Sequence, residues 1–141
     1  MYENYSRQSL PSKEYRELLG SAICVFNSNN QFIIENILRI DNKNQYNWYD
    51  LIEKTSGGLS KAIKETITKE SGSDIARLFN ELIQERNRII HSFQITTKNN
   101  EQKLNTKNNN NEQWTIEKEE LLEFIKKNGK LSCKLHELRG Y

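Results

Sequence analysis

The sequence is poor in cysteine and proline and has no long hydrophobic run. Its two cysteines, Cys24 and Cys133, lie far apart with no second pair beside either, which excludes a local metal site built from paired cysteines. We expect two reduced thiols in an intracellular, cytoplasmic protein; a single disulfide in a secreted chain is the alternative. The lack of an apolar run predicts no membrane span, and no secretory leader is recognisable.

A strong charge of either sign is also lacking. The 21 basic residues almost balance the 19 acidic ones, which gives a net charge of +2. A protein that binds nucleic acid through its net charge has a larger excess of basic residues. Any polyanion therefore has to bind a local basic patch. The 141 residues fit one domain with a modest core, and a hydrophobic fraction of only 35% means that much of the chain is solvated.

Helical spacing of apolar residues dominates the first two thirds of the chain. Residues 1–11 show no periodicity and are expected to form a flexible arm, ahead of one domain over residues 12–141. Ser12 is a typical helix cap, and the apolar pattern behind it continues to Ile40. Polar residues 27–30 interrupt this pattern, either as a turn of one long helix or as a break between two; one helix is favoured.

Shorter elements follow. The pattern predicts a short helix from Trp48 that ends near Gly57 and Gly58, and a second helix over residues 59–67. A break at residues 71–73 precedes the most regular amphipathic helix of the chain, which is expected to reach about His91.

The last third changes character. Alternating residues 93–97 and 102–106 indicate a β-hairpin, and the asparagine-rich residues 108–111 indicate a flexible loop. Thr115 is the expected cap of another helix, with an end or kink at Asn128 and Gly129 and a short terminal helix beyond. We therefore predict an all-α fold: a small up-and-down bundle of four to five helices, with a β-hairpin insertion at residues 93–112 before the last long helix.

The end of the amphipathic helix carries the residues best suited to chemistry. His91 can exchange a proton near neutral pH, and Arg86 can hold a phosphate. Arg86 interrupts the apolar stripe of the helix, where a charge is costly unless it is paired or lies at an interface. Helical spacing places Asn80, Gln84, Asn87 and His91 in one polar column beside that stripe.

Each feature also has a structural explanation. His91 can be a helix-terminal histidine that satisfies the last carbonyls. Arg86 can pair with Glu81, Glu85 or a carboxylate on another helix, and the polar column can be a solvated face. The second histidine, His136, is expected on the surface of the terminal helix. An aromatic cluster is expected to pack in the core or anchor a loop, with base stacking as the minor alternative; it comprises Tyr46, Trp48 and Tyr49.

Residues 86–91 resemble the R-N-x-x-x-H signature of the HEPN superfamily, small helical domains of prokaryotic toxin, anti-phage and RNA-processing systems. The resemblance covers residues 12–139 at the level of helix order and six residues at the level of identity. It implies metal-independent RNA cleavage by a homodimer, without a cofactor, and products with a 2′,3′-cyclic phosphate and a 5′-hydroxyl. His91 is implied as general acid or base, Arg86 as the phosphate ligand, and Asn87 as the residue that orients the imidazole or the phosphate.

Other implications of the resemblance remain open. Arg88 and Ser92 are candidate substrate-binding residues, with solvent-facing positions as the simpler alternative. Members regulated by adenylylation carry a tyrosine two places after the histidine; Phe93 stands there, which excludes that modification at this position but leaves other antitoxins or regulatory proteins as partners. Many members are catalytically silent, so an RNA- or protein-binding module is the second hypothesis, and an unrelated helical adaptor is the third.

Overall fold

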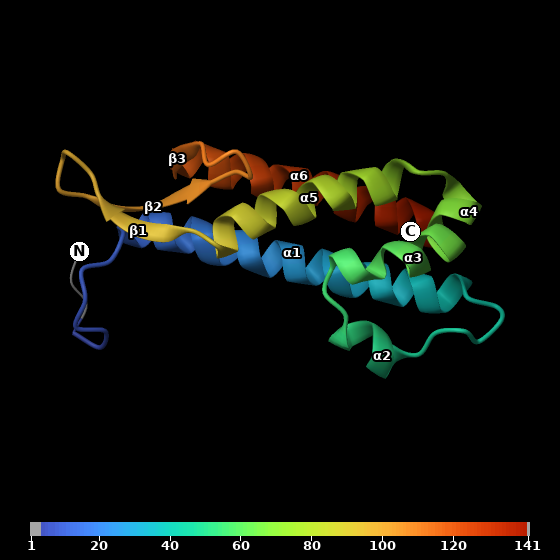
Figure 1. Ribbon diagram of the computed structural model, residues 1–141. Coiled ribbons are helices and arrows are strands. Elements are labelled where there is room, and N and C mark those ends of the chain that lie inside the picture. Colours follow the sequence, from blue (N-terminus) through green and yellow to red (C-terminus); the bar gives the residue numbers. More distant parts are fainter. Residues whose placement is uncertain (1–3, 141) are drawn as a thin grey trace.

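Three long helices form the body of the molecule in the computed structural model, which describes residues 4–140 (Figure 1). They are α1 (Lys13–Ile40), α5 (Asp74–Ile90) and α6 (Lys118–Arg139). Helix α1 runs away from a small sheet, α5 returns toward it, and α6 runs alongside α1 (Figure 1). The predicted up-and-down helical body is therefore confirmed, although the three strands make the fold mostly helical rather than all-α.

Helix α1 is unbroken, as favoured from the sequence. The Ser12 hydroxyl accepts a hydrogen bond from the Tyr15 amide at 3.2 Å and caps its first turn. The polar stretch that interrupts the apolar pattern is used for packing. The buried Asn29 side chain donates to the Asn128 carbonyl at 2.8 Å and to the Asn128 Oδ1 at 3.0 Å, which ties α1 to α6.

Helix α6 continues to Arg139, so the separate terminal helix predicted beyond Asn128 and Gly129 is wrong. The Asn128 side chain donates to the Phe124 carbonyl at 2.9 Å inside the helix, while Asn29 satisfies its remaining oxygens. A buried asparagine that has all its partners does not end a helix. Asn128-Gly129 would signal a turn only if the asparagine side chain lacked these hydrogen-bond partners.

The segment between α1 and α5 is a series of short helical pieces at the end of the bundle away from the sheet (Figure 1). Helix α2 (Trp48–Glu53) ends earlier than predicted, and Gly57 opens the 3₁₀ turn η1 (Gly57–Leu59) instead of ending α2. Three further pieces follow: α3 (Ser60–Ile63), the π-helical turn η2 (Lys64–Thr68) and α4 (Lys69–Ser71). Gly72 then takes a positive φ of 91°, which suits glycine at the end of a helix.

The insertion is a three-stranded antiparallel sheet in the order β1-β2-β3, one strand more than predicted. The strands are β1 (Phe93–Thr96), β2 (Gln102–Lys107) and β3 (Gln113–Ile116). The hairpin of β1 and β2 is confirmed, with Phe93 opposite Asn105. Thr115, predicted as a helix cap, lies in β3, where its hydroxyl donates to Asn105 Oδ1 at 2.7 Å.

The asparagine-rich tip is an ordered turn between β2 and β3. The Asn108 side chain accepts hydrogen bonds from the amides of Asn110 at 2.9 Å and Glu112 at 3.0 Å, and Asn111 takes a positive φ of 64°. Asparagine tolerates this left-handed backbone better than most residues. The turn brings β3 back onto β2. The residues predicted as a flexible loop therefore form the hydrogen-bonded turn that positions the third strand.

Hydrogen bonds from buried and half-buried side chains attach the sheet to the bundle. The buried Tyr15 hydroxyl of α1 donates to the Ile116 carbonyl at 2.6 Å and accepts from the Leu104 amide at 3.2 Å. The Thr106 hydroxyl of β2 donates to the Arg88 carbonyl at 2.7 Å near the end of α5. Gln94 of β1 also donates to the Ser9 carbonyl at 2.8 Å, so the predicted arm contacts the sheet edge.

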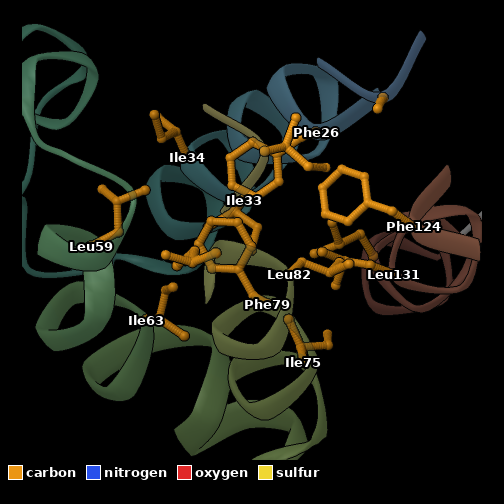
Figure 2. Packing of buried hydrophobic residues seen from close by; sticks show 14 of the residues in the cluster. Phe26, Ile33, Ile34, Leu59, Ile63, Ile75, Phe79, Leu82, Phe124 and Leu131 are labelled. Carbon is orange, nitrogen blue, oxygen red and sulfur yellow. The ribbon is translucent and has the colours of Figure 1, made fainter. Parts of the chain in front are cut away.

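One hydrophobic core joins the helices (Figure 2). At its centre the Phe26 ring stacks on Phe79 and Phe124, with centroid distances of 5.8 and 6.3 Å. Cys24 and Cys133 are free and exposed. Among residues 4–140, no helix combines the length and the apolar character needed to cross a membrane.

Candidate active site at the end of helix α5

Helix α5 presents a buried stripe to the other helices, and Arg86 lies within it. The other members of this stripe are apolar and buried: Ile75, Phe79, Leu82 and Ile89. The Arg86 guanidinium carbon sits 4.6 Å from the centroid of the buried Phe26 ring. The predicted interruption of the apolar stripe by a cation is therefore confirmed.

Arg86 is half-buried, and its charge is unpaired within the described part of the chain. Glu81 and Glu85 instead lie 4.0 and 3.1 Å from Lys127 of α6, and no carboxylate of another described helix pairs with Arg86, so the alternative of an ion-paired arginine does not apply. Burial lowers the pKa of the Arg86 guanidinium, which stays charged because arginine holds its proton in proteins. The Phe26 ring face compensates part of the desolvation. A cation of this kind is suited to an incoming anion.

Asn87 orients the guanidinium. Its Oδ1 accepts a hydrogen bond from Arg86 Nε at 3.1 Å, which leaves the terminal nitrogens of Arg86 for other partners. The resemblance assigned Asn87 to the imidazole or the phosphate, whereas this hydrogen bond directs it to the arginine. The predicted polar column is solvated: Asn80, Gln84 and His91 are exposed and Asn87 is half-buried.

His91 is the residue at which α5 ends. Its amide donates to the Asn87 carbonyl at 2.9 Å, and its side chain is exposed, with no side-chain hydrogen bond to any residue in 4–140. The structural explanation considered above, an imidazole that satisfies the last carbonyls, does not apply. The Ser92 hydroxyl takes that role by donating to the Ile89 carbonyl at 2.6 Å. The imidazole is thereby left accessible.

Arg88, the other candidate substrate ligand, joins α5 to the sheet. Its guanidinium donates to the Lys107 carbonyl at the end of β2. One guanidinium nitrogen is thus committed to the fold, while the side chain also lines a cleft of about 320 Å³. That cleft includes Trp114 of β3, a residue that no sequence pattern had indicated as functional.

Arg86 and His91 diverge around the helix axis. Five residues at about 100° each place them about 140° apart, so one helix does not present both groups to one phosphate. Two large apolar side chains at this end of the molecule are also exposed, Ile90 at 50% and Phe93 at 45%. Exposed apolar groups next to a half-buried cation are typical of a surface that a partner covers.

Other candidate sites among the described residues are less suited to binding an anion or to catalysis. A larger cleft of about 500 Å³ lies where α1 ends, but its lining mixes both charge signs; it includes Asp41, Lys43, Glu65, Lys69 and Glu70. His136 is exposed as predicted, with its ring 4.7 Å from Phe32. In the predicted aromatic cluster, Tyr46 and Trp48 pack against the core and Tyr49 projects outward.

Comparisons with family models, with curated proteins and with solved structures gave no match. Within residues 4–140, no three histidine, cysteine or acidic side chains lie close enough together to hold a metal ion. The geometry at the end of α5 is therefore the main evidence on the function of this chain.

Proposed function

We propose that the protein is a HEPN-type endoribonuclease that cleaves RNA without a metal ion and acts as a homodimer. The observation that carries this proposal is Arg86, a half-buried guanidinium with no carboxylate partner among the described residues, in the same six-residue motif as an exposed imidazole. The nucleic-acid phosphate supplies the missing anion. A role as a toxin or anti-phage effector follows from the resemblance of residues 86–91.

The chemistry needs only proton transfer and charge stabilisation. A ribose 2′-oxygen attacks the adjacent phosphorus while the phosphorus–O5′ bond breaks. One imidazole takes the 2′-hydroxyl proton, and a second, protonated imidazole gives a proton to the leaving 5′-oxygen. Arg86 holds the phosphate and stabilises its growing negative charge, with Asn87 fixing the guanidinium. The products are a 2′,3′-cyclic phosphate and a 5′-hydroxyl.

Two copies of the chain account for the geometry. A dimer that joins the ends of both α5 helices brings Arg86 of one copy toward His91 of the other, which offsets their divergence on a single helix. It also covers Ile90 and Phe93, whose exposed area favours association by the hydrophobic effect. Both imidazoles are then available as acid and base. An antitoxin or another regulatory protein remains a further partner of this surface.

The relative loss on replacing two neighbouring arginines tests the proposal. We expect Arg86→Ala to lower RNA cleavage about 10²–10³-fold, because it removes a preorganised ligand of the transition state. Arg88→Ala should lower it about tenfold or less, since Arg88 points to β2 rather than into the apolar stripe. Initial rates on a labelled RNA in EDTA, with thermal unfolding of each variant, measure both effects.

The outcomes separate three functions. Equal losses for the two variants, at unchanged stability, contradict the assignment of Arg86 to the phosphate. RNA binding without cleavage by the wild-type protein identifies a silent binding module. Neither binding nor cleavage, with loss of self-association as the only effect of Arg86→Ala, identifies a protein–protein adaptor.

A further inference from the structure

A cleft beside the candidate active site is formed by α5 and the turn between β2 and β3. Its volume is about 320 Å³, at the lower end of the range of about 300–1,000 Å³ for ligand pockets. Three of its residues come from α5, two from the turn between β2 and β3, and one from β3: Gln84, Glu85, Arg88, Asn108, Asn109 and Trp114. One wall is therefore aromatic and the others are polar, a composition that suits a flat, hydrogen-bonding ligand.

The Trp114 ring is held in place. Its indole Nε1 donates to both carboxylate oxygens of Glu120 in α6, at 3.1 and 3.3 Å. Burial raises the pKa of the Glu120 carboxyl, the Trp114 hydrogen bond lowers it, and the nearby Glu85 charge raises it further. The indole is thus fixed by its edge over a partly desolvated carboxylate. The half-buried ring also lines the cleft, so the part of its aromatic surface that faces the cleft can serve as a stacking platform.

Two amides of the cleft are available for a ligand. Gln84 and Asn109 are exposed, and neither side chain hydrogen-bonds to another residue within the described chain. Two neighbouring side chains already have partners within the fold: Asn108 caps the turn, and Glu85 Oε1 accepts from Lys127 at 3.1 Å, whereas the buried Glu85 Oε2 accepts no hydrogen bond from the described residues. An amide offers one acceptor and two donors, the combination that reads the edge of a nucleobase.

The cleft is aligned with the catalytic histidine of the proposal. Gln84, Arg88 and His91 follow the spacing i, i+4, i+7 and share one face of α5. At 1.5 Å per residue, Gln84 lies about 10 Å from His91 along the helix axis. An RNA strand with its scissile phosphate at His91 therefore reaches the cleft with a neighbouring nucleotide. Arg88 lies between them as a cation for the backbone.

We propose that this cleft binds an unpaired purine base of the RNA substrate, next to the cleaved bond, and sets the sequence preference of cleavage. The base stacks on Trp114, and its edge hydrogen-bonds to Gln84 and Asn109. Purines are favoured over pyrimidines because the larger ring covers more of the indole face. The role in cleavage rests on the proposed function, whereas base binding does not.

Trp114 fluorescence tests this directly because the chain has only two tryptophans. In a Trp48→Phe, His91→Ala protein, Trp114 is the only indole and RNA stays intact. Titration with short single-stranded RNAs should quench its fluorescence saturably, with oligoadenylate or a guanine-containing strand binding several-fold tighter than oligouridylate. An abasic strand of equal length is the control and should leave the fluorescence unchanged.

Two substitutions complete the test, with anisotropy of a labelled purine strand as readout. Trp114→Leu should weaken binding about tenfold or more, while Trp114→Phe keeps a platform and most of the affinity. Gln84→Ala, at an exposed position, should reduce the purine preference without changing the fold. Unchanged binding by both Trp114→Leu and Gln84→Ala, or equal quenching by the abasic strand, overturns the proposal.

The two proposals fail differently. If the wild-type chain does not cleave RNA but purine strands still quench Trp114, the nuclease proposal fails and the base site stands. If the chain cleaves RNA and Trp114→Leu changes neither KM nor the preferred cleavage position, the base site fails and the nuclease proposal stands.

Discussion

Replacing His91 with alanine should lower RNA cleavage by about 10²–10⁴-fold, the contribution typical of a positioned acid or base. The effect should appear in kcat, because in the proposed mechanism the imidazole transfers protons and Arg86 holds the phosphate. Stability should hardly change, since the His91 side chain is exposed and its helix end is capped by Ser92. Cleavage rates in EDTA and thermal unfolding of the same samples measure the two effects.

The second histidine provides the matched control. His136 is exposed in the last turn of α6, and this end of the helix lies away from the sheet (Figure 1), so His136→Gln should cleave RNA at the wild-type rate. Product ends give a further check, because attack of the ribose 2′-oxygen on phosphorus, with loss of the 5′-oxygen, leaves a 2′,3′-cyclic phosphate. Wild-type cleavage by His91→Ala, or products with a 3′-hydroxyl, would contradict the mechanism.

The largest loss of stability is expected at Phe26. Its ring is 1% exposed and stacks on Phe79 and Phe124, so Phe26→Ala leaves a cavity where α1, α5 and α6 meet. We expect the free energy of unfolding to fall by about 3–5 kcal/mol, a large part of the roughly 5–15 kcal/mol that stabilises a typical domain. Urea unfolding followed by circular dichroism measures the change.

Leu122→Ala is the control for this substitution, because Leu122 is 42% exposed on α6. It should cost about 1 kcal/mol or less. Phe26 also supports the Arg86 guanidinium at 4.6 Å, so Phe26→Ala should reduce cleavage even at temperatures where the protein stays folded. Similar losses of stability for both variants would show that the aromatic stack is not the centre of the core.

Long amphipathic elements were predictable from the sequence, and elements defined by tertiary partners were not. Helices α1 and α5 follow their apolar periodicity, with Ser12 as the expected cap. Strand β3 has only four residues and depends on pairing with β2. Asn128 was misread because its partner, Asn29, lies on another helix. The contact that decides Asn128 is 99 residues away in the sequence, whereas β3 is decided by a nearby turn whose side-chain hydrogen bonds the asparagine-rich composition did not indicate.

The candidate site also has features that the sequence predicts and features that only the fold reveals. Arg86 was predictable because a cation at an apolar position is visible in the helical pattern of α5 alone. Its contact with Phe26 was not, since that ring belongs to α1. The cleft at Trp114 was also not predictable, because the asparagine turn is what places β3 beside α5. Sequence patterns thus locate the reactive residues, while folding supplies their surroundings.

In the proposed homodimer the ends of two α5 helices meet. A cysteine in place of Ile90 tests this contact most directly. With Cys24 and Cys133 changed to serine, Ile90→Cys should form a disulfide-linked dimer under mild oxidation, because residues near a twofold axis lie close to their own copies. Ile52→Cys, at a site of similar exposure (46%) on α2, should stay monomeric on the same non-reducing gel. If Ile90→Cys stays monomeric, or both variants cross-link equally, the shared site at the end of α5 is contradicted.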